Sequence, residues 1–167
     1  MSFEIKKAVS KDDFYLISEL AKEIWNEHYI SILKKEQIDY MTDKFQSLNA
    51  ISYQIANEGY CYYILFNEHP LGYFAIKKED DRLFLSKLYI LKGERGKGYS
   101  GFVISFLKEY AIKNNLKSIY LTVNKENKSS IEVYNHFGFK IVDKKKADIG
   151  NGFYMDDFIM EKEVAHV

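Results

Sequence analysis

The chain has 167 residues, of which 47% are hydrophobic and 29% charged, so an ordinary buried core is expected. Lysine plus arginine equals aspartate plus glutamate, 24 each, which argues against a nucleic-acid partner and against a polybasic membrane surface. The single cysteine, Cys61, excludes an internal disulfide framework and a multi-cysteine metal cage.

The first ten residues alternate in polarity and carry charges, so they lack the apolar segment of a signal peptide. The longest apolar run, residues 60–66, is too short to cross a bilayer. We therefore expect a cytoplasmic protein with no membrane partner. The four histidines show no metal-ligand spacing, and no metal is expected.

Helices followed by an antiparallel meander are predicted for the first half of the chain. Ser10, with Asp13 three residues later, is a capping-box-like helix start, and apolar residues recur at helical spacing to about Asn26. Two apolar runs, 60–66 and 71–77, flank a turn and predict a hairpin. Further helices are expected over 35–45 and 50–57, and further strands over 3–7 and 82–91.

The pattern changes after the meander. A glycine-rich stretch at residues 94–101 precedes a helix that is predicted to end near residue 114, and a strand over 118–123 follows. This order implies a right-handed crossover and a parallel strand pair. A short helix over 128–136 and strands over 139–143 and 153–161 complete the chain. We predict one α+β domain over residues 1–167, with a mixed, mostly antiparallel sheet flanked by helices.

The glycine-rich stretch contains the spacing G-x-G-x-x-G at Gly96, Gly98 and Gly101. A Walker loop is excluded because its glycine spacing is absent. A dinucleotide fold is disfavoured because the next strand ends at Asn124 rather than at an acidic residue, and because an antiparallel meander precedes the loop. Too few residues follow for the remaining strands and helices of that fold.

Two interpretations of the loop remain. The first is another kind of phosphate cradle, since a helix N-terminus attracts anions and glycines let a pyrophosphate approach the backbone. Arg95 and Lys97 add positive charge to that cradle. The second is a flexible turn with solvated charges.

A second motif favours the cradle. Asn127, Ser130, Val133 and Tyr134 form N-x-x-S-x-x-V-Y, and Gly-Phe follows after three residues. With this motif the chain resembles the GNAT superfamily of N-acetyltransferases. The resemblance assigns Arg95, Gly98 and Ser100 to the family's acetyl-coenzyme A motif. Ser100 departs from the usual glycine or alanine there. The order of elements is also similar over nearly the whole chain.

The resemblance implies a GNAT-like sheet whose parallel strand pair lies at the coenzyme A site. It implies acetyl-CoA as cosubstrate and transfer of the acetyl group to a primary amine by direct attack. A small amine or polyamine is the favoured acceptor, because residues 25–29, 36–45 and 150–162 loosely resemble bacterial spermidine/spermine acetyltransferases. A protein or peptide acceptor, and a non-catalytic coenzyme A-binding sensor, stay open as alternatives. A homodimer is a family-level expectation.

The same resemblance implies roles for individual residues. The backbone of the strand before the loop would pair with the pantetheine arm, at Leu88, Tyr89 and Ile90. The pyrophosphate would be held by the loop residues Arg95, Gly96, Lys97, Gly98, Tyr99, Ser100 and Gly101. Asn127 would contact the coenzyme arm, cap the following helix, or do both. Tyr134 would donate a proton to the departing thiolate, because an ordinary tyrosine, with a pKa of about 10, stays protonated at neutral pH.

A proton acceptor is also expected, because only about one in a thousand lysine-like amines is neutral at pH 7. The candidates on the acceptor side are Glu27, His28, Asp156 and Asp157, and no motif selects among them. Glu19, Glu23 and Glu27 share one helix face. That stripe would attract a polycation, although a solvated helix face is the commoner explanation for such spacing.

Overall fold

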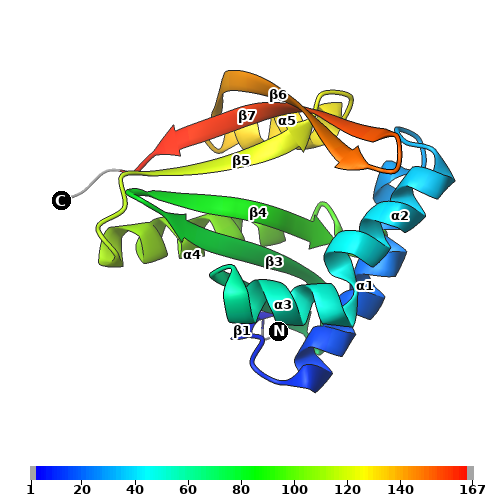
Figure 1. Cartoon of the computed structure of the whole chain (residues 1–167). Helices are drawn as coiled ribbons and strands as arrows, with labels where there is room; N and C mark the ends of the chain where they lie inside the picture. Colours follow the sequence, from blue (N-terminus) through cyan, green and yellow to red (C-terminus); the bar gives the residue numbers. More distant parts are fainter. Residues whose placement is uncertain (1–2, 165–167) are drawn as a thin grey trace. The chain divides into compact units, whose positions relative to one another are not determined.

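The computed structural model describes residues 3–164 and divides into two compact units. The first unit contains the chain up to residue 77 together with residues 87–97, and the second contains residues 78–86 and the chain from residue 98 onward. Figure 1 shows their elements coloured along the sequence.

The strands form a seven-stranded sheet in the order β1-β2-β3-β4-β5-β7-β6. The strands are β1 (Phe3–Lys7), β2 (Tyr60–Asn67), β3 (His69–Glu79), β4 (Arg82–Ile90), β5 (Ser118–Asn124), β6 (Lys140–Gly150) and β7 (Phe153–Glu163). The β4–β5 pair is parallel, whereas β1–β2, β2–β3, β5–β7 and β6–β7 are antiparallel. The predicted α+β class with one parallel strand pair is therefore confirmed.

The helices of the first unit are α1 (Lys11–Tyr29), α2 (Lys35–Gln46) and α3 (Leu48–Asn57), with a short 3-10 turn η1 (Lys92–Glu94). Ser10 and Asp13 form the predicted capping box of α1. The prediction ended α1 too early, near Asn26. The helix continues to Tyr29 because the Tyr29 side chain is buried and adds one more turn to the apolar face.

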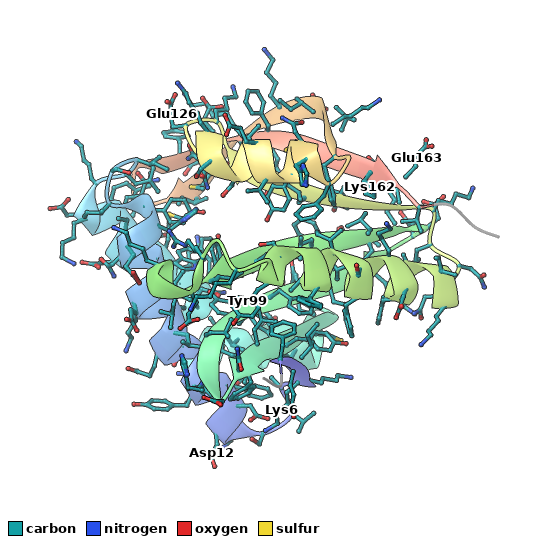
Figure 2. The ribbon with its side chains drawn as sticks, turned by 180° about the vertical axis from the view of Figure 1, so that it is seen from behind. Lys6, Asp12, Tyr99, Glu126, Lys162 and Glu163 are labelled. Carbon is teal, nitrogen blue, oxygen red and sulfur yellow. The ribbon has the colours of Figure 1, made fainter. Side chains whose placement is uncertain are left out.

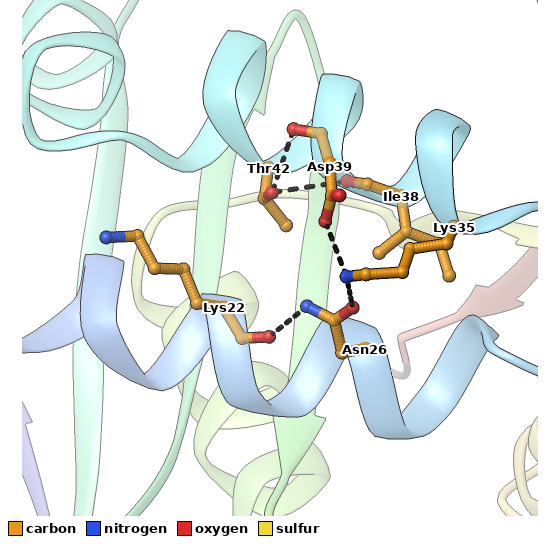
Figure 3. Close-up of polar contacts among 6 residues, drawn as sticks. All are labelled: Lys22, Asn26, Lys35, Ile38, Asp39 and Thr42. Atoms are coloured by element: carbon orange, nitrogen blue, oxygen red, sulfur yellow. Dashed lines mark hydrogen bonds and ion pairs between the residues drawn. The ribbon is translucent and has the colours of Figure 1, made fainter.

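Polar contacts join α1 to α2 on the solvent side of these helices (Figure 3). Asn26 donates through Nδ2 to the Lys22 carbonyl at 2.7 Å, and its Oδ1 accepts from the Lys35 ammonium at 3.4 Å. Lys35 also pairs with Asp39 at 3.3 Å. These contacts are exposed, so they add little to stability.

A buried chain of hydrogen bonds lies beneath the same helices. Trp25 Nε1 donates to the Tyr73 hydroxyl at 2.9 Å, which in turn donates to Gln46 Oε1 at 2.6 Å. The amide nitrogen of Gln46 donates to the Tyr62 hydroxyl at 3.0 Å, and Tyr62 donates to Gln54 at 2.6 Å. Each of these five buried side chains thus has a hydrogen-bond partner, and the chain of bonds links α1, α2 and α3 to strands β2 and β3.

The second unit contains α4 (Tyr99–Lys113) and α5 (Lys128–His136) beside the strands β5, β6 and β7. In Figure 1 β5, β7 and β6 lie side by side. The prediction of β6 was too short, since the strand runs from Lys140 to Gly150. No residue of β6 is buried, so its sequence shows no alternation of apolar and polar residues. Pairing with β7 extends it.

Candidate functional site

The glycine loop leads into α4 with two residues in the left-handed region. Gly96 has φ of 78° and Gly98, the N-cap of α4, has φ of 84°. A Cβ built at either position meets no heavy atom within 4 Å. Gly98 offers no side chain to cap the first turn of this 15-residue helix, whose start is marked by Tyr99 in Figure 2. The open backbone and the positive helix end suit an anion.

The loop's two cations are held differently. Arg95 donates through Nε to the Ile90 carbonyl at 2.9 Å, which uses one of the five guanidinium donors and ties the loop to the end of β4. Lys97 pairs with Glu94 at 3.1 Å, and Glu94 also contacts His69 at 3.2 Å. Glu94 therefore offsets the charge of Lys97, and Arg95 is the loop cation without an acidic partner among the described residues.

The third glycine of the G-x-G-x-x-G spacing has no special geometry. Gly101 lies inside α4 and does not have positive φ. A Cβ at this position would lie 3.7 Å from the Phe137 ring, an ordinary van der Waals contact. The backbone conformation thus requires glycine at Gly96 and Gly98 but not at Gly101, so the resemblance to a dinucleotide fingerprint is incidental. Ser100 is half-buried in the first turn of α4.

The end of β4 carries Leu88, Tyr89 and Ile90, and its position depends on a glycine that the sequence interpretation missed. A Cβ at Gly72 would collide with the Tyr89 carbonyl oxygen and lie 3.1 Å from the Ile90 Cα. The Leu91 amide donates to the Leu71 carbonyl at 2.9 Å beside this point. An isolated glycine within a predicted strand is a known signal of close backbone approach, and it was available in the sequence.

Tyr89 belongs to an aromatic cluster at the end of α1. Its hydroxyl lies 3.0 Å from that of Tyr29, and its ring centroid lies 5.4 Å from Trp25 and 5.7 Å from His28. Burial of His28, together with the nearby Arg95 charge, lowers the pKa of His28 to about 4. His28 is therefore neutral at pH 7 and is a weak proton acceptor.

Glu27, next to His28, has one buried carboxylate oxygen, Oε1, without a hydrogen-bond partner among the described residues. Buried carboxylate oxygens are normally satisfied, so this one is suited to a donor from outside the chain. The rest of the acidic stripe differs. Glu19 and Glu23 are exposed, and Glu19 pairs with Lys22 at 3.2 Å, as a solvated helix face does.

Asn127 caps α5, which confirms the cap interpretation. Its side-chain oxygen accepts from the Ser130 amide at 3.3 Å, and the residue is buried (Figure 2, where Glu126 marks this end of the helix). Tyr134 lies two turns further along α5 and is half-buried. Its ring makes an edge-to-face contact with the buried Phe139 ring, with 5.6 Å between the centroids. This contact orients the phenol.

Asp156 and Asp157 are neighbours on β7 in different environments. Asp156 is 51% exposed in its side chain and pairs with Lys125 at 2.9 Å. Asp157 has a buried Oδ1 without a hydrogen-bond partner among residues 3–164. Burial and the charge of Asp156 raise the pKa of Asp157 to about 6, against the opposing effect of Lys145 and Lys125.

Within residues 3–164, no three or more histidine, cysteine, aspartate or glutamate side chains gather in a way that would hold a metal ion. None of the helices in that part of the chain is long and apolar enough to cross a membrane.

The parallel strand pair, with a glycine-capped helix between its strands, is the arrangement of an acyl-coenzyme A-dependent transferase. The chain belongs to the acetyltransferase (GNAT) family, whose model matches residues 17–139 and so covers more than half of it. It is accordingly an N-acetyltransferase, and acetyl-CoA is its cosubstrate.

Solved structures share this fold. The PaiA N-acetyltransferase from Thermoplasma acidophilum, in complex with coenzyme A, is 24% identical, with a TM-score of 0.82 and coverage of 98% of this chain and 99% of that one. A chimera of the spermidine N-acetyltransferase SpeG from Vibrio cholerae and hSSAT is 20% identical, with a TM-score of 0.67 and coverage of 96% and 95%. At these identities the similarity establishes the fold.

Proposed function

We propose that the chain transfers the acetyl group of acetyl-CoA directly to a primary amine of a small molecule, with polyamines as the favoured class. The observation that carries the proposal is the loop before α4, where two left-handed glycines leave the backbone open and the helix has no side-chain cap. The whole of residues 1–167 would act as one catalytic domain, since the family match includes segments of both compact units.

The proposed roles of the coenzyme-binding residues follow from their chemistry. The loop Arg95–Gly101 would hold the pyrophosphate through backbone N–H groups and the Arg95 guanidinium. The extended backbone of Leu88, Tyr89 and Ile90 would pair with the amides of the pantetheine arm, as an added strand does. The side-chain oxygen of Asn127 caps α5, and the residue would also contact the coenzyme arm from this position.

Tyr134 is proposed as the general acid. The amine nitrogen attacks the thioester carbonyl carbon, the new C–N bond forms, and the C–S bond breaks. The Tyr134 hydroxyl would give its proton to the departing sulfur, which avoids release of a free thiolate. The chain requires no covalent intermediate for this reaction, and Cys61 on β2 has no assigned part in it.

The acceptor proposal rests on Glu27. Its unpartnered buried oxygen would accept a hydrogen bond from an ammonium group of the acceptor, and a second ammonium group on the same molecule is the defining feature of a polyamine. The SpeG neighbours are spermidine or spermidine/spermine acetyltransferases, which agrees with this class. Amino acids, aminoglycosides and peptides are the competing acceptors.

The test is release of coenzyme A thiol from acetyl-CoA with a panel of polyamines, amino acids, aminoglycosides and peptides. We expect turnover with polyamines and a loss of about 10²–10⁴-fold in kcat for Tyr134→Phe, because the proton donor is removed. Tyr53→Phe is the matched control, since Tyr53 is 60% exposed on α3 and should keep wild-type turnover. Coenzyme A binding without turnover of any amine would instead indicate a sensor.

A further inference from the structure

Two adjacent carboxylates on β7 differ in whether a cation neutralises them. The ammonium of Lys125 lies 2.9 Å from Asp156, and the Lys125 backbone N–H donates to the Asp156 carbonyl at 3.1 Å. Lys125 is thus held by Asp156 through both side chain and backbone. Asp157, one residue on, keeps a buried oxygen that no described donor satisfies.

The strand register places Asp157 at a defined point of the second unit. It lies opposite Asn124, the last residue of β5, and opposite Lys145 on β6. Asn124 uses its side-chain oxygen to accept from the Glu126 amide at 2.9 Å, in the turn that leads to the cap of α5. The carboxylate of Asp157 therefore lies at the end of β5 from which the Tyr134-bearing helix begins.

Two of the other candidate proton acceptors, His28 and Asp156, fit less well. His28 holds a proton too weakly at neutral pH, because burial and Arg95 lower its pKa to about 4. Asp156 is exposed and its charge is already paired with Lys125. Asp157 has a pKa of about 6, so it is mostly ionised at pH 7 yet holds a proton more strongly than an ordinary aspartate. A base whose pKa lies near the working pH is the efficient one.

We propose that Asp157 is the proton acceptor of the reaction, with its unpartnered oxygen directed to the attacking amine either directly or through one water. This inference rests on the proposed function. Asp157 takes one proton from the ammonium, and the freed lone pair forms the C–N bond as the C–S bond breaks. The second proton lost from nitrogen replaces the one that Tyr134 gives to sulfur. The products are the acetamide, coenzyme A thiol and one proton on Asp157.

The experiment is the pH dependence of kcat for the panel amine with the highest turnover, at saturating acetyl-CoA. Wild type should show an acidic limb near pH 6. Asp157→Asn should lose that limb and lower kcat at pH 7.5 by about 10²–10⁴-fold, because the base is gone. Its melting temperature should rise at pH 7.5 but not at pH 4, since the charged carboxylate is disfavoured in the folded state. A structural defect in Asp157→Asn would instead lower the melting temperature.

Neighbouring charges provide the matched variants. Asp156→Asn removes a like charge and should move the limb to lower pH, whereas Lys145→Gln removes an opposite charge and should move it to higher pH. Glu27→Gln should raise KM for the acceptor and keep the limb. A limb that persists in Asp157→Asn, or that the neighbours do not move, overturns this inference alone. Absence of turnover with every amine overturns the proposed function as well.

Discussion

Lys87 on β4 shows how burial acts on a single charged residue. Lys87 belongs to the first unit. Its ammonium lies 5.4 Å from the Tyr60 ring centroid and 5.8 Å from the Tyr62 ring centroid. Burial lowers the pKa of Lys87 to about 8 from an ordinary value of 10.5, and the negative charge of Glu58 opposes that shift in part. The aromatic contacts do not fully replace the lost hydration.

This shift predicts a pH-dependent effect of Lys87→Met on stability. Below pH 8 the lysine is protonated in both states and the folded state bears the full desolvation penalty, so the variant should be more stable at pH 7, on the order of 1 kcal/mol. Between pH 8 and 10.5 the folded wild type loses the proton first and recovers stability. The advantage of the variant should then disappear.

Urea unfolding of both proteins at pH 7 and above pH 10 measures the difference in the free energy of unfolding. Lys77→Met is the control, because the Lys77 ammonium also lies over the Tyr60 ring, at 5.2 Å. It shows what loss of the other cation from this ring does. An advantage of Lys87→Met that does not change with pH would contradict the burial explanation.

At the scale of elements, the start of α4 distinguishes two glycines that look alike in the sequence. Gly98→Ala should destabilise the protein by about 1–2 kcal/mol, because a Cβ is strained at φ of 84°. Gly101→Ala should be neutral or stabilise by up to about 1 kcal/mol, because alanine favours the helix interior and the nearest ring is 3.7 Å away. Thermal unfolding of both variants and of wild type measures these differences in stability.

Two outcomes of these stability measurements would contradict the expectations for α4. If Gly98→Ala unfolds as easily as wild type, the left-handed cap is not required. If Gly101→Ala is strongly destabilised, the contact with Phe137 is tighter than the structure indicates. The affinity of the Gly101→Ala protein for coenzyme A also shows whether a residue as small as glycine in the first turn of α4 is needed for ligand binding.

Local chemistry explains which elements were predictable. The capping box at Ser10 and the cap at Asn127 each depend on residues three apart, so the sequence alone identifies the starts of α1 and α5. The end of α1 and the full length of β6 were not predictable. Burial of Tyr29 in the first unit extends the former, and pairing with β7 extends the latter.

For the whole molecule, ligand binding to the native state should raise the melting temperature. Coenzyme A or acetyl-CoA at about 100 times its Kd should add about 2.7 kcal/mol, which corresponds to roughly 5–10 °C for a chain of this size. NAD at the same concentration should give no shift, because the third glycine of the fingerprint has no special geometry. Differential scanning fluorimetry provides the measurement.

Variants that remove one positive charge test where coenzyme A binds. Arg95→Gln should reduce the coenzyme A shift, because Arg95 is the loop cation that no described acidic side chain neutralises. Lys108→Gln, which removes an exposed charge from α4, should leave it unchanged. A shift with NAD and none with coenzyme A would contradict the pyrophosphate assignment.

The sequence by itself determined the class of protein, since the α+β order, the loop before α4 and the motif ending in Tyr134 depend on spacing along the chain. It also defined the candidates for proton transfer. The tertiary structure distinguished the environments of Asp156 and Asp157 and revealed the need for Gly72. Burial and charge neutralisation arise from strands distant in sequence, here Lys125 after β5, Lys145 on β6 and the Tyr89 carbonyl on β4. Residue spacing does not record those distances.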